Sequence, residues 1–166
     1  MIMLIVFGLG VVVFLFFSVI PILRGAPFVP LHKKWLDTAL EFLDLKPGQK
    51  IADLGSVDGR VLIETAKRGI ISFGYEINPL LVLKTKIEAK KQGVSNLVFC
   101  YWKSYWGVNW GEFDVIFIFG ISHIMKAVEK KAKKELKPGT RIVCFGFKLP
   151  NWLAIFSKNG VYIYQK

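Results

Sequence analysis

Two carboxylates and two glycines form the group of residues in this sequence that is best suited to binding a ligand. Asp53 ends an apolar run, and Gly55 and Gly59 follow it within the segment Ile51–Arg60. Glycine allows a tight turn and a close approach of the backbone to a ligand. Glu76 ends the next apolar run, where a carboxylate can accept hydrogen bonds from both hydroxyls of a ribose. The four residues together predict a nucleoside site.

The spacing of the glycines argues against a dinucleotide. A dinucleotide-binding loop has glycine at its first, third and sixth positions, so that a pyrophosphate can rest on the helix N-terminus. Counted from Gly55, the third and sixth positions hold Val57 and Arg60. Asp53 and Asp58 instead favour a ligand with positive charge and no phosphate. S-adenosylmethionine has an ammonium, a sulfonium and a ribose, and we expect it to be the cofactor.

Strands and helices that alternate along the chain would position these residues. Apolar runs predict strands at 50–54, 71–75, 97–101, 113–119 and 141–147. Helical spacing and end signals predict helices at 31–45, 60–68, 79–92 and 124–137. This alternation indicates a parallel sheet with right-handed crossovers.

The C-terminal segment breaks the alternation. Too few residues separate Phe147 from Val161 for a helical crossover. Asn159-Gly160 is a strong signal for a two-residue hairpin, with strands expected at 153–156 and 161–164. We therefore predict an α/β, Rossmann-like, doubly wound and mainly parallel sheet that ends in an antiparallel hairpin.

The first residues of the chain differ in composition from the rest. Ile2–Leu23 contains no charged residue, and as a helix it would extend over roughly 33 Å, enough to cross a hydrocarbon core about 30 Å thick. It lacks the basic start and the small-residue cleavage site of a secretory signal. A buried core helix is the alternative. We predict a transmembrane anchor at 1–23, a proline linker at 24–30 and a single catalytic domain at 31–166.

The charges indicate the orientation of the anchor and the nature of its surroundings. Arg24, Lys33 and Lys34 follow the apolar run, so the positive-inside rule places the domain on the cytoplasmic side or on an equivalent, matrix-like side. The net charge of +11 implies an anionic partner surface. Cys100 and Cys144 lie in predicted strands without a partner motif, so we expect neither a disulfide nor a metal site.

The predicted helix at 124–137 carries one basic and one apolar stripe. The basic stripe consists of Lys126, Lys130, Lys133, Lys134 and Lys137, and the apolar one of Ile124, Val128, Ala132 and Leu136. The basic stripe fits either a solvated helix face or a contact with anionic lipid beside the anchor.

Several segments, taken together, resemble a known family. The chain resembles the class I, seven-β-strand methyltransferases that depend on S-adenosylmethionine, and within them the small membrane-anchored protein-lysine methyltransferases that act on the c-ring protein of ATP synthase and on the adenine nucleotide translocase. The resemblance covers the whole chain, including the N-terminal span. The matching motifs are Pro27–Pro30, Asp53–Arg60, Gly74–Pro79, Phe119-Gly120 and Leu149–Trp152.

The resemblance and the residue pattern together imply a cofactor site but no specific catalytic residue. The expected cofactor-binding residues are Asp53, Gly55, Ser56, Asp58, Gly59, Glu76, Asn78, Ser104 and Phe119. Two positions depart from the family. Val57 replaces a glycine and is expected to demand a different backbone path, and Ser104 replaces an acidic residue that meets the adenine amine. A serine oxygen accepts that hydrogen bond more weakly than a carboxylate does.

The sequence leaves three classes of function open. The first is a membrane-tethered methyltransferase that modifies a protein lysine near the bilayer. The second is a methyltransferase for a lipid, a quinone or another small molecule; a nucleic acid substrate is disfavoured because Phe119–Ser122 lacks the acidic or amide residue and two prolines of base-amine methyltransferases. The third is a degenerate, non-catalytic cofactor-binding protein. Four aromatic residues are expected either to wall a lysine pocket or to cover the sheet edge or contact lipid headgroups: Trp102, Tyr105, Trp106 and Trp110.

Overall fold

The computed structural model describes residues 31–166, together with Met3, Phe7 and Gly8. The predicted anchor at 1–23, apart from those three residues, and the predicted linker at 24–30 lie outside the described residues. Within the described part of the chain, no helix combines the length and the apolar character that a membrane crossing needs.

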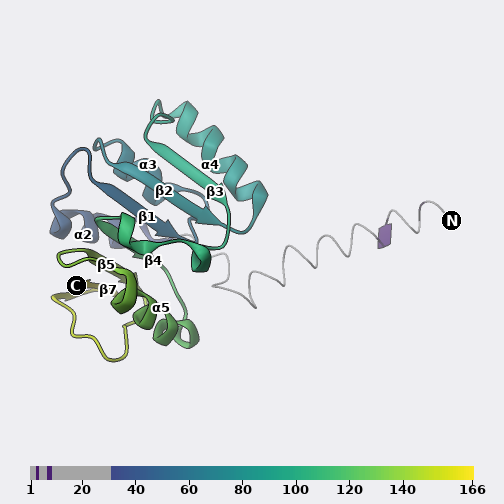
Figure 1. The fold of residues 1–166 in the computed structure, drawn as a ribbon. Helices are drawn as coiled ribbons and strands as arrows, with labels where there is room; N and C mark the ends of the chain where they lie inside the picture. Colours follow the sequence, from purple (N-terminus) through teal and green to yellow (C-terminus); the bar gives the residue numbers. More distant parts are fainter. Residues whose placement is uncertain (1–2, 4–6, 9–30) are drawn as a thin grey trace.

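Seven strands form one sheet (Figure 1). In chain order they are β1 (Lys50–Leu54), β2 (Ile71–Glu76), β3 (Val98–Trp102), β4 (Val115–Ile118), β5 (Arg141–Phe145), β6 (Phe156–Lys158) and β7 (Val161–Gln165). Their order across the sheet is β3-β2-β1-β4-β5-β7-β6. The first five strands pair in parallel, and β7 pairs antiparallel with both β5 and β6. The predicted Rossmann-like sheet with an antiparallel end is confirmed.

The helices cover both faces of the sheet, so side chains that alternate along each strand enter two separate cores. On one face, α2 (Lys33–Leu43), α3 (Arg60–Ala66) and α4 (Pro79–Lys91) pack against strand residues such as Ile51 and Phe117. On the other, α5 (Ser122–Glu135) and the 3-10 turns η1 (Tyr105–Gly107) and η2 (Trp110–Glu112) pack against residues such as Ala52 and Ile116. All four predicted helices are present, with ends shifted by a few residues.

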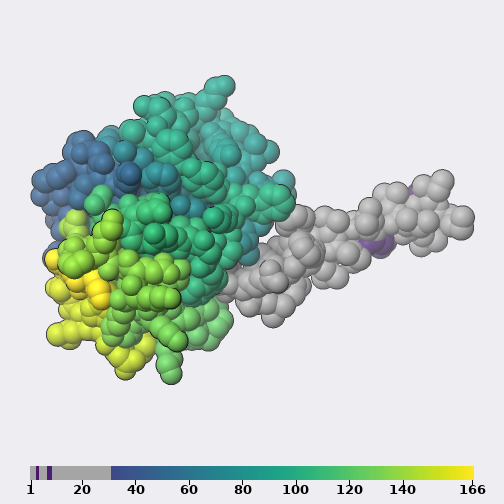
Figure 2. Space-filling model, viewed as in Figure 1, coloured from purple at the N-terminus to yellow at the C-terminus, as the bar shows by residue number. Residues whose placement is uncertain are grey.

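The C-terminal hairpin contains the predicted two-residue turn. Asn159 has a φ of 50° and Gly160 a φ of 82°, the left-handed pair that such a turn requires. Lys158 pairs with Val161, so the first arm has to end immediately before the turn. The predicted bounds of this arm, 153–156, were therefore wrong: β6 begins at Phe156 and ends at Lys158. The C-terminal end, yellow in Figure 2, lies against α5, where Lys166 Nζ donates to the Lys133 carbonyl at 2.8 Å.

The lysines of the basic stripe on α5 are exposed, but the ammonium of Lys133 forms hydrogen bonds within the protein. Val128 and Ala132 are buried on the opposite side of the helix, as predicted. Lys133 donates at 2.6 Å to the buried carboxylate of Glu129 and at 2.9 Å to the carbonyl of Asn151. Its ammonium thus has a structural role in attaching the segment after β5 to the helix.

Candidate cofactor-binding site

The two acidic residues predicted to bind the cofactor lie at the carboxyl ends of neighbouring parallel strands. Asp53 is in β1 and Glu76 ends β2, with Asp53 paired in register with Gly74. Both carboxyl groups are buried, with 6% and 7% of the residue exposed. This edge of an open parallel sheet is where ligands of α/β proteins bind.

Backbone amides hold the Glu76 carboxylate in position. Oε2 accepts from Val57 N at 3.0 Å, and Oε1 accepts from Asn78 N at 2.9 Å. Burial raises the pKa of Glu76, while hydrogen bonds from the amides of Asn78, Val57 and Ile77 act in the opposite direction. Each carboxylate oxygen has a second lone pair available. Glu76 thereby ties the glycine loop to the end of β2 and can still accept two hydroxyl hydrogen bonds.

Asp53, in contrast, receives no hydrogen bond from the described residues. Burial, together with the nearby charges of Glu76 and Asp58, raises the pKa of Asp53 to about 8. A buried carboxylate without a partner is costly unless a cation or a proton compensates it. A ligand with an ammonium group would favour the ionised form, and Asp53 is therefore suited to binding a cation.

The loop between β1 and α3 enters the left-handed region of backbone conformation three times. The φ values are 84° at Gly55, 50° at Val57 and 75° at Gly59. Glycine adopts such angles freely, whereas a β-branched residue does so only with strain. Val57 thus keeps the left-handed conformation that a glycine would adopt more easily, and its backbone is strained. In this conformation its amide donates to Glu76.

Gly59 also allows the two helices beside the loop to approach closely. A Cβ atom at this position would lie 2.3 Å from Cγ2 of Thr85 on α4. The hydroxyl of Thr85 is buried and has no hydrogen-bond partner among the described residues. Any side chain at position 59 would push α4 away from the loop.

Asp58 is bound by a cation of the protein itself. Arg60 Nη2 lies 2.7 Å from Asp58 Oδ2, and Arg60 Nε lies 3.1 Å from Asp58 Oδ1. Burial opposes the ionisation of Asp58, but the hydrogen bonds and the charge of Arg60 outweigh it and lower its pKa. Arg60 Nη1 also donates to the carbonyl of Leu31. Arg60 thus partly neutralises the charge of Asp58, which still lines the cavity, and a role of Asp58 toward a cationic ligand stays a prediction.

A small cavity connects these groups. Its volume is about 20 Å³, room for about one water molecule and far too little for a nucleoside. A nucleoside bound here would therefore extend out of the cavity or displace part of its lining. The cavity is lined by Leu31, Asp53, Gly55, Ser56, Val57, Asp58, Arg60, Val61, Phe119 and Phe145.

The other predicted site residues are distributed unevenly. Phe119 borders the cavity and packs edge-on against Trp35, with ring centroids 5.8 Å apart. The hydroxyl of Ser56 lies 3.6 Å from Cys100 Sγ in the interior. The side chain of Asn78 caps α4 by accepting from Leu80 N at 3.0 Å. Ser104 is exposed before η1 and does not line the cavity. Ser56 and Asn78 thus have structural contacts of their own.

The four aromatic residues between β3 and β4 do not form one pocket wall. Trp110 is completely buried, and its Nε1 donates to the Tyr105 carbonyl at 3.1 Å. The side chain of Tyr105 is also buried, in the same core as Trp110. Trp102 is 69% exposed, and its Nε1 donates to the Ile77 carbonyl at 2.9 Å. The expectation of a shared aromatic pocket was wrong for Trp110, which is a core residue.

Four residues of the cavity were missed by sequence reasoning. Leu31, Val61 and Phe145 are apolar residues that the sequence does not distinguish from core positions. Arg60 was noted only as the residue in the place of a glycine. Its opposite charge two positions after Asp58 is a signal that could have indicated the ion pair.

Comparisons with known proteins agree with this geometry. The family model described as ANTKMT methyltransferase domain matches residues 53–155. The lysine N-methyltransferase of the ATP synthase C protein from Homo sapiens is 35% identical over 136 residues, which cover 81% of this chain and 58% of that protein. The adenine nucleotide translocase lysine N-methyltransferase of Mus musculus is 31% identical over 137 residues, covering 82% and 59%. This chain therefore spans less than two thirds of the length of either relative.

A solved structure shows the same fold. An RNA methyltransferase from Salinibacter ruber, crystallised with S-adenosyl-L-homocysteine, superposes with a TM-score of 0.76 at 29% identity, covering 82% of this chain and 91% of that one. The family match begins at Asp53 at the cofactor edge of β1 and extends over more than half of the chain. The protein therefore belongs to the ANTKMT methyltransferase family, with the fold of the S-adenosylmethionine-dependent class I methyltransferases.

Proposed function

We propose that this protein is an S-adenosylmethionine-dependent methyltransferase that methylates a lysine amine of a protein substrate, and that residues 1–23 anchor it in a membrane. The observation that carries the proposal is the pair of buried carboxylates at the sheet edge. Glu76 is fixed by two amides with lone pairs to spare, and Asp53 is buried without a partner among the described residues. The family match and the S-adenosyl-L-homocysteine bound to the Salinibacter enzyme support the choice of cofactor.

The site residues fit a cationic nucleoside. Glu76 would accept from the ribose hydroxyls, Asp53 would compensate the ammonium, and Gly55, whose missing side chain leaves open space, would allow a close approach. When bound, S-adenosylmethionine supplies an electrophilic methyl group on a sulfonium. The protein then has mainly to position the substrate and to exclude water.

The acceptor amine has to lose a proton before it reacts. With a reference pKa near 10.4, deprotonation of a lysine costs roughly 4.6 kcal/mol at pH 7. An apolar and electropositive surrounding disfavours the ammonium and reduces this cost. Leu31, Phe119 and Phe145 provide apolar surface at the cavity, and the chain has a net charge of +11. No side chain is assigned as a general base.

The relatives support a protein as the substrate, since their names refer to the C protein of ATP synthase and to the adenine nucleotide translocase. The anchor adds a restriction on distance. A linker of seven residues at 24–30 reaches at most about 25 Å when extended. The target lysine should therefore lie near the membrane, on the cytoplasmic or equivalent side that the basic residues after the anchor favour.

Methyl transfer is tested with the full chain, membranes and S-adenosylmethionine labelled in its methyl group. A labelled protein band that is absent with Glu76→Ala supports the proposal, and mass spectrometry would then identify the lysine. A labelled lipid or quinone extract, or labelled RNA, would replace the proposed substrate class. Cofactor binding without any label would indicate a non-catalytic protein.

The anchor is tested separately by extracting membranes at alkaline pH with carbonate. A spanning helix keeps the full chain in the membrane pellet. A chain that washes off under these conditions would contradict the anchor without affecting the proposed reaction.

A further inference from the structure

Helix α4 is apolar on two opposite faces. Val82, Thr85 and Ala89 face the sheet and are buried. Leu80, Leu83 and Ile87 recur at the same helical spacing on the outer side, with 67%, 56% and 47% of their surface exposed. A helix with apolar residues on both faces normally has a partner on each. The sheet provides one partner, and no described residue covers the other face.

Lysines border this outer apolar stripe. At 100° per residue, Lys84 and Lys91 lie on one side of the stripe, and Lys86 and Lys90 lie on the other. All four are exposed, and among the described residues only Lys91 forms an ion pair with a carboxylate, that of Glu88 at 4.0 Å. An apolar stripe with basic residues along both margins is typical of helices that lie on anionic membrane surfaces.

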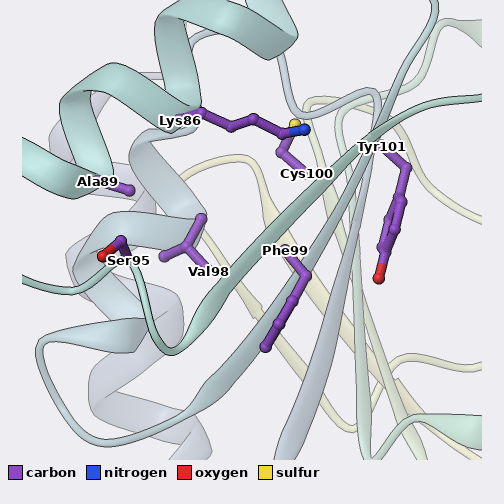
Figure 3. A pocket seen from close by; sticks show the side chains of 7 residues that line it. All are labelled: Lys86, Ala89, Ser95, Val98, Phe99, Cys100 and Tyr101. Carbon is purple, nitrogen blue, oxygen red and sulfur yellow. The ribbon is translucent and has the colours of Figure 1, made fainter.

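The edge strand β3 lies beside α4 and adds an exposed aromatic residue. A pocket of about 250 Å³ separates them, and Figure 3 shows Lys86 extending from α4 across it toward Cys100. Trp102 ends the strand and is 69% exposed. It alternates with Tyr101, which stacks on Tyr75 on the other face, so Trp102 lies on the same face of the sheet as Cys100 and α4. The indole N–H of Trp102 is already bonded to the Ile77 carbonyl at 2.9 Å, so its ring is exposed without an unsatisfied donor. Tryptophan in this state suits the boundary between headgroups and acyl chains.

This surface also adjoins the point where the N-terminal residues join the domain. Lys84 is close enough to Asp58 for its charge to lower the pKa of that carboxyl, and Thr85 contacts Gly59. Asp58 is in turn connected through Arg60 to the carbonyl of Leu31. Thirty residues precede Leu31, including the uncharged run at 2–23. The chain therefore enters the domain beside the same loop that α4 borders.

We propose that the outer face of α4, together with Trp102, is a docking surface for an anionic bilayer. The apolar side chains would enter the headgroup region while the four lysines contact lipid phosphates. Helix α5 is less suited to this role, because its exposed lysines surround no exposed large apolar residue. The inference rests on the proposed anchor only for bringing the domain to a membrane.

The test uses the full chain in phosphatidylcholine vesicles with and without phosphatidylglycerol. A fluorophore is attached at Leu83→Cys, and its quenching by spin-labelled lipid is compared with that at Leu153→Cys, a site that is 90% exposed between β5 and β6. The native cysteines Cys100 and Cys144 are buried, so labelling is directed to the new site. We expect several-fold stronger quenching at position 83, and only in vesicles that contain phosphatidylglycerol.

Two further variants separate the contributions. Replacing the four lysines by glutamine should abolish the dependence on phosphatidylglycerol, and Leu80→Ser with Ile87→Ser should reduce quenching at position 83 in vesicles that contain phosphatidylglycerol. Equal quenching at positions 83 and 153 would overturn the proposal. Protection of position 83 only when a protein substrate is added would also overturn it and would indicate a protein partner. Retained methylation without docking would leave the proposed function intact.

Discussion

The glycine loop after β1 and the hairpin turn before β7 both contain residues with left-handed backbone conformation, but the residue types at these positions differ. The hairpin places Asn159 and Gly160 at φ values of 50° and 82°, and these are the residue types that adopt such angles most readily. The loop places Val57 at the same 50°, and both Val57 and Asp53, whose carboxyl group has no hydrogen-bond partner among the described residues, line the cavity. The turn is therefore optimised for folding, whereas the loop retains backbone strain and a buried carboxyl group whose ionisation a cationic ligand would favour.

The largest test of this difference is the removal of the Asp53 charge. Because the pKa of Asp53 is raised from 3.8 to about 8 on folding, the folded state prefers the protonated acid. The contribution of Asp53 to the stability of the fold is therefore complete below about pH 4 and is lost as the pH rises through about 8. Asp53→Asn should therefore unfold with a free energy larger by on the order of 4 kcal/mol at pH 8, with little difference near pH 4. Urea unfolding at both pH values measures it.

The same variant should bind S-adenosylmethionine much more weakly, because the partner of the ammonium is lost. Glu41→Gln, at an exposed position on α2, is the matched control for removing one carboxylate. If both variants show the same pH dependence of stability as the unaltered chain, the buried charge at Asp53 is not a cost to the fold.

Removing Glu76 should weaken cofactor binding by roughly 1.5 to 3 kcal/mol, the range for hydrogen bonds to a charged group. Its carboxylate also holds the amides of Val57 and Asn78, so the loop itself should become more mobile. Calorimetry of Glu76→Ala gives the affinity, and hydrogen exchange at Val57 gives the loop contribution. Unchanged affinity would rule out the assignment of Glu76 to the ribose.

Placing valine in the hairpin reproduces there the strain of the loop. Asn159→Val should destabilise the fold by about 1 to 2 kcal/mol, because a β-branched residue is strained at a φ of 50°. Valine at the exposed neighbouring position, Lys158→Val, controls for the exchange of a polar side chain for valine. A variant as stable as the unaltered chain would mean that the hairpin accommodates valine by changing its turn.

The reverse change in the loop should have the smallest effect. Val57→Gly relieves the strain but increases the entropy of the unfolded chain, and a net stabilisation of about 1 kcal/mol is expected. Thermal unfolding measures this effect, and cofactor affinity should rise or stay unchanged because the amide at position 57 is retained. A loss of stability would show that the valine side chain contributes packing that outweighs its strain.

The fold was largely predictable, because its strands and helices alternate and have clear end signals. Asn78-Pro79 starts α4, and Asn159-Gly160 fixes the hairpin. The errors concern ends that tertiary contacts determine. For example, β4 begins only at Val115, because the side chain of Asp114 accepts from Lys50 N at 2.7 Å.

The site was predictable only where strand ends determine it. Asp53 and Glu76 meet because they end neighbouring parallel strands, and alternation alone anticipates this arrangement. The Arg60–Asp58 pair and the packing of Leu31 and Phe145 around the cavity depend on side-chain directions that one sequence does not reveal. The burial of Trp110 was missed for the same reason, since an aromatic residue in a connecting segment has no periodic pattern to indicate its direction.

The contact between Arg60 and Leu31 gives the domain a thermodynamic link between its N-terminal entry point and its cofactor site. Arg60 holds the carbonyl of the first residue of the domain and, through Asp58, the loop beside the cofactor cavity. If a bound cofactor displaces Arg60, it weakens the contact between Arg60 and Leu31. A restraint that strengthens this contact must then lower cofactor affinity, and by linkage the two effects have the same factor. Occupancy of the site and placement of the N-terminal segment then belong to one reciprocal equilibrium.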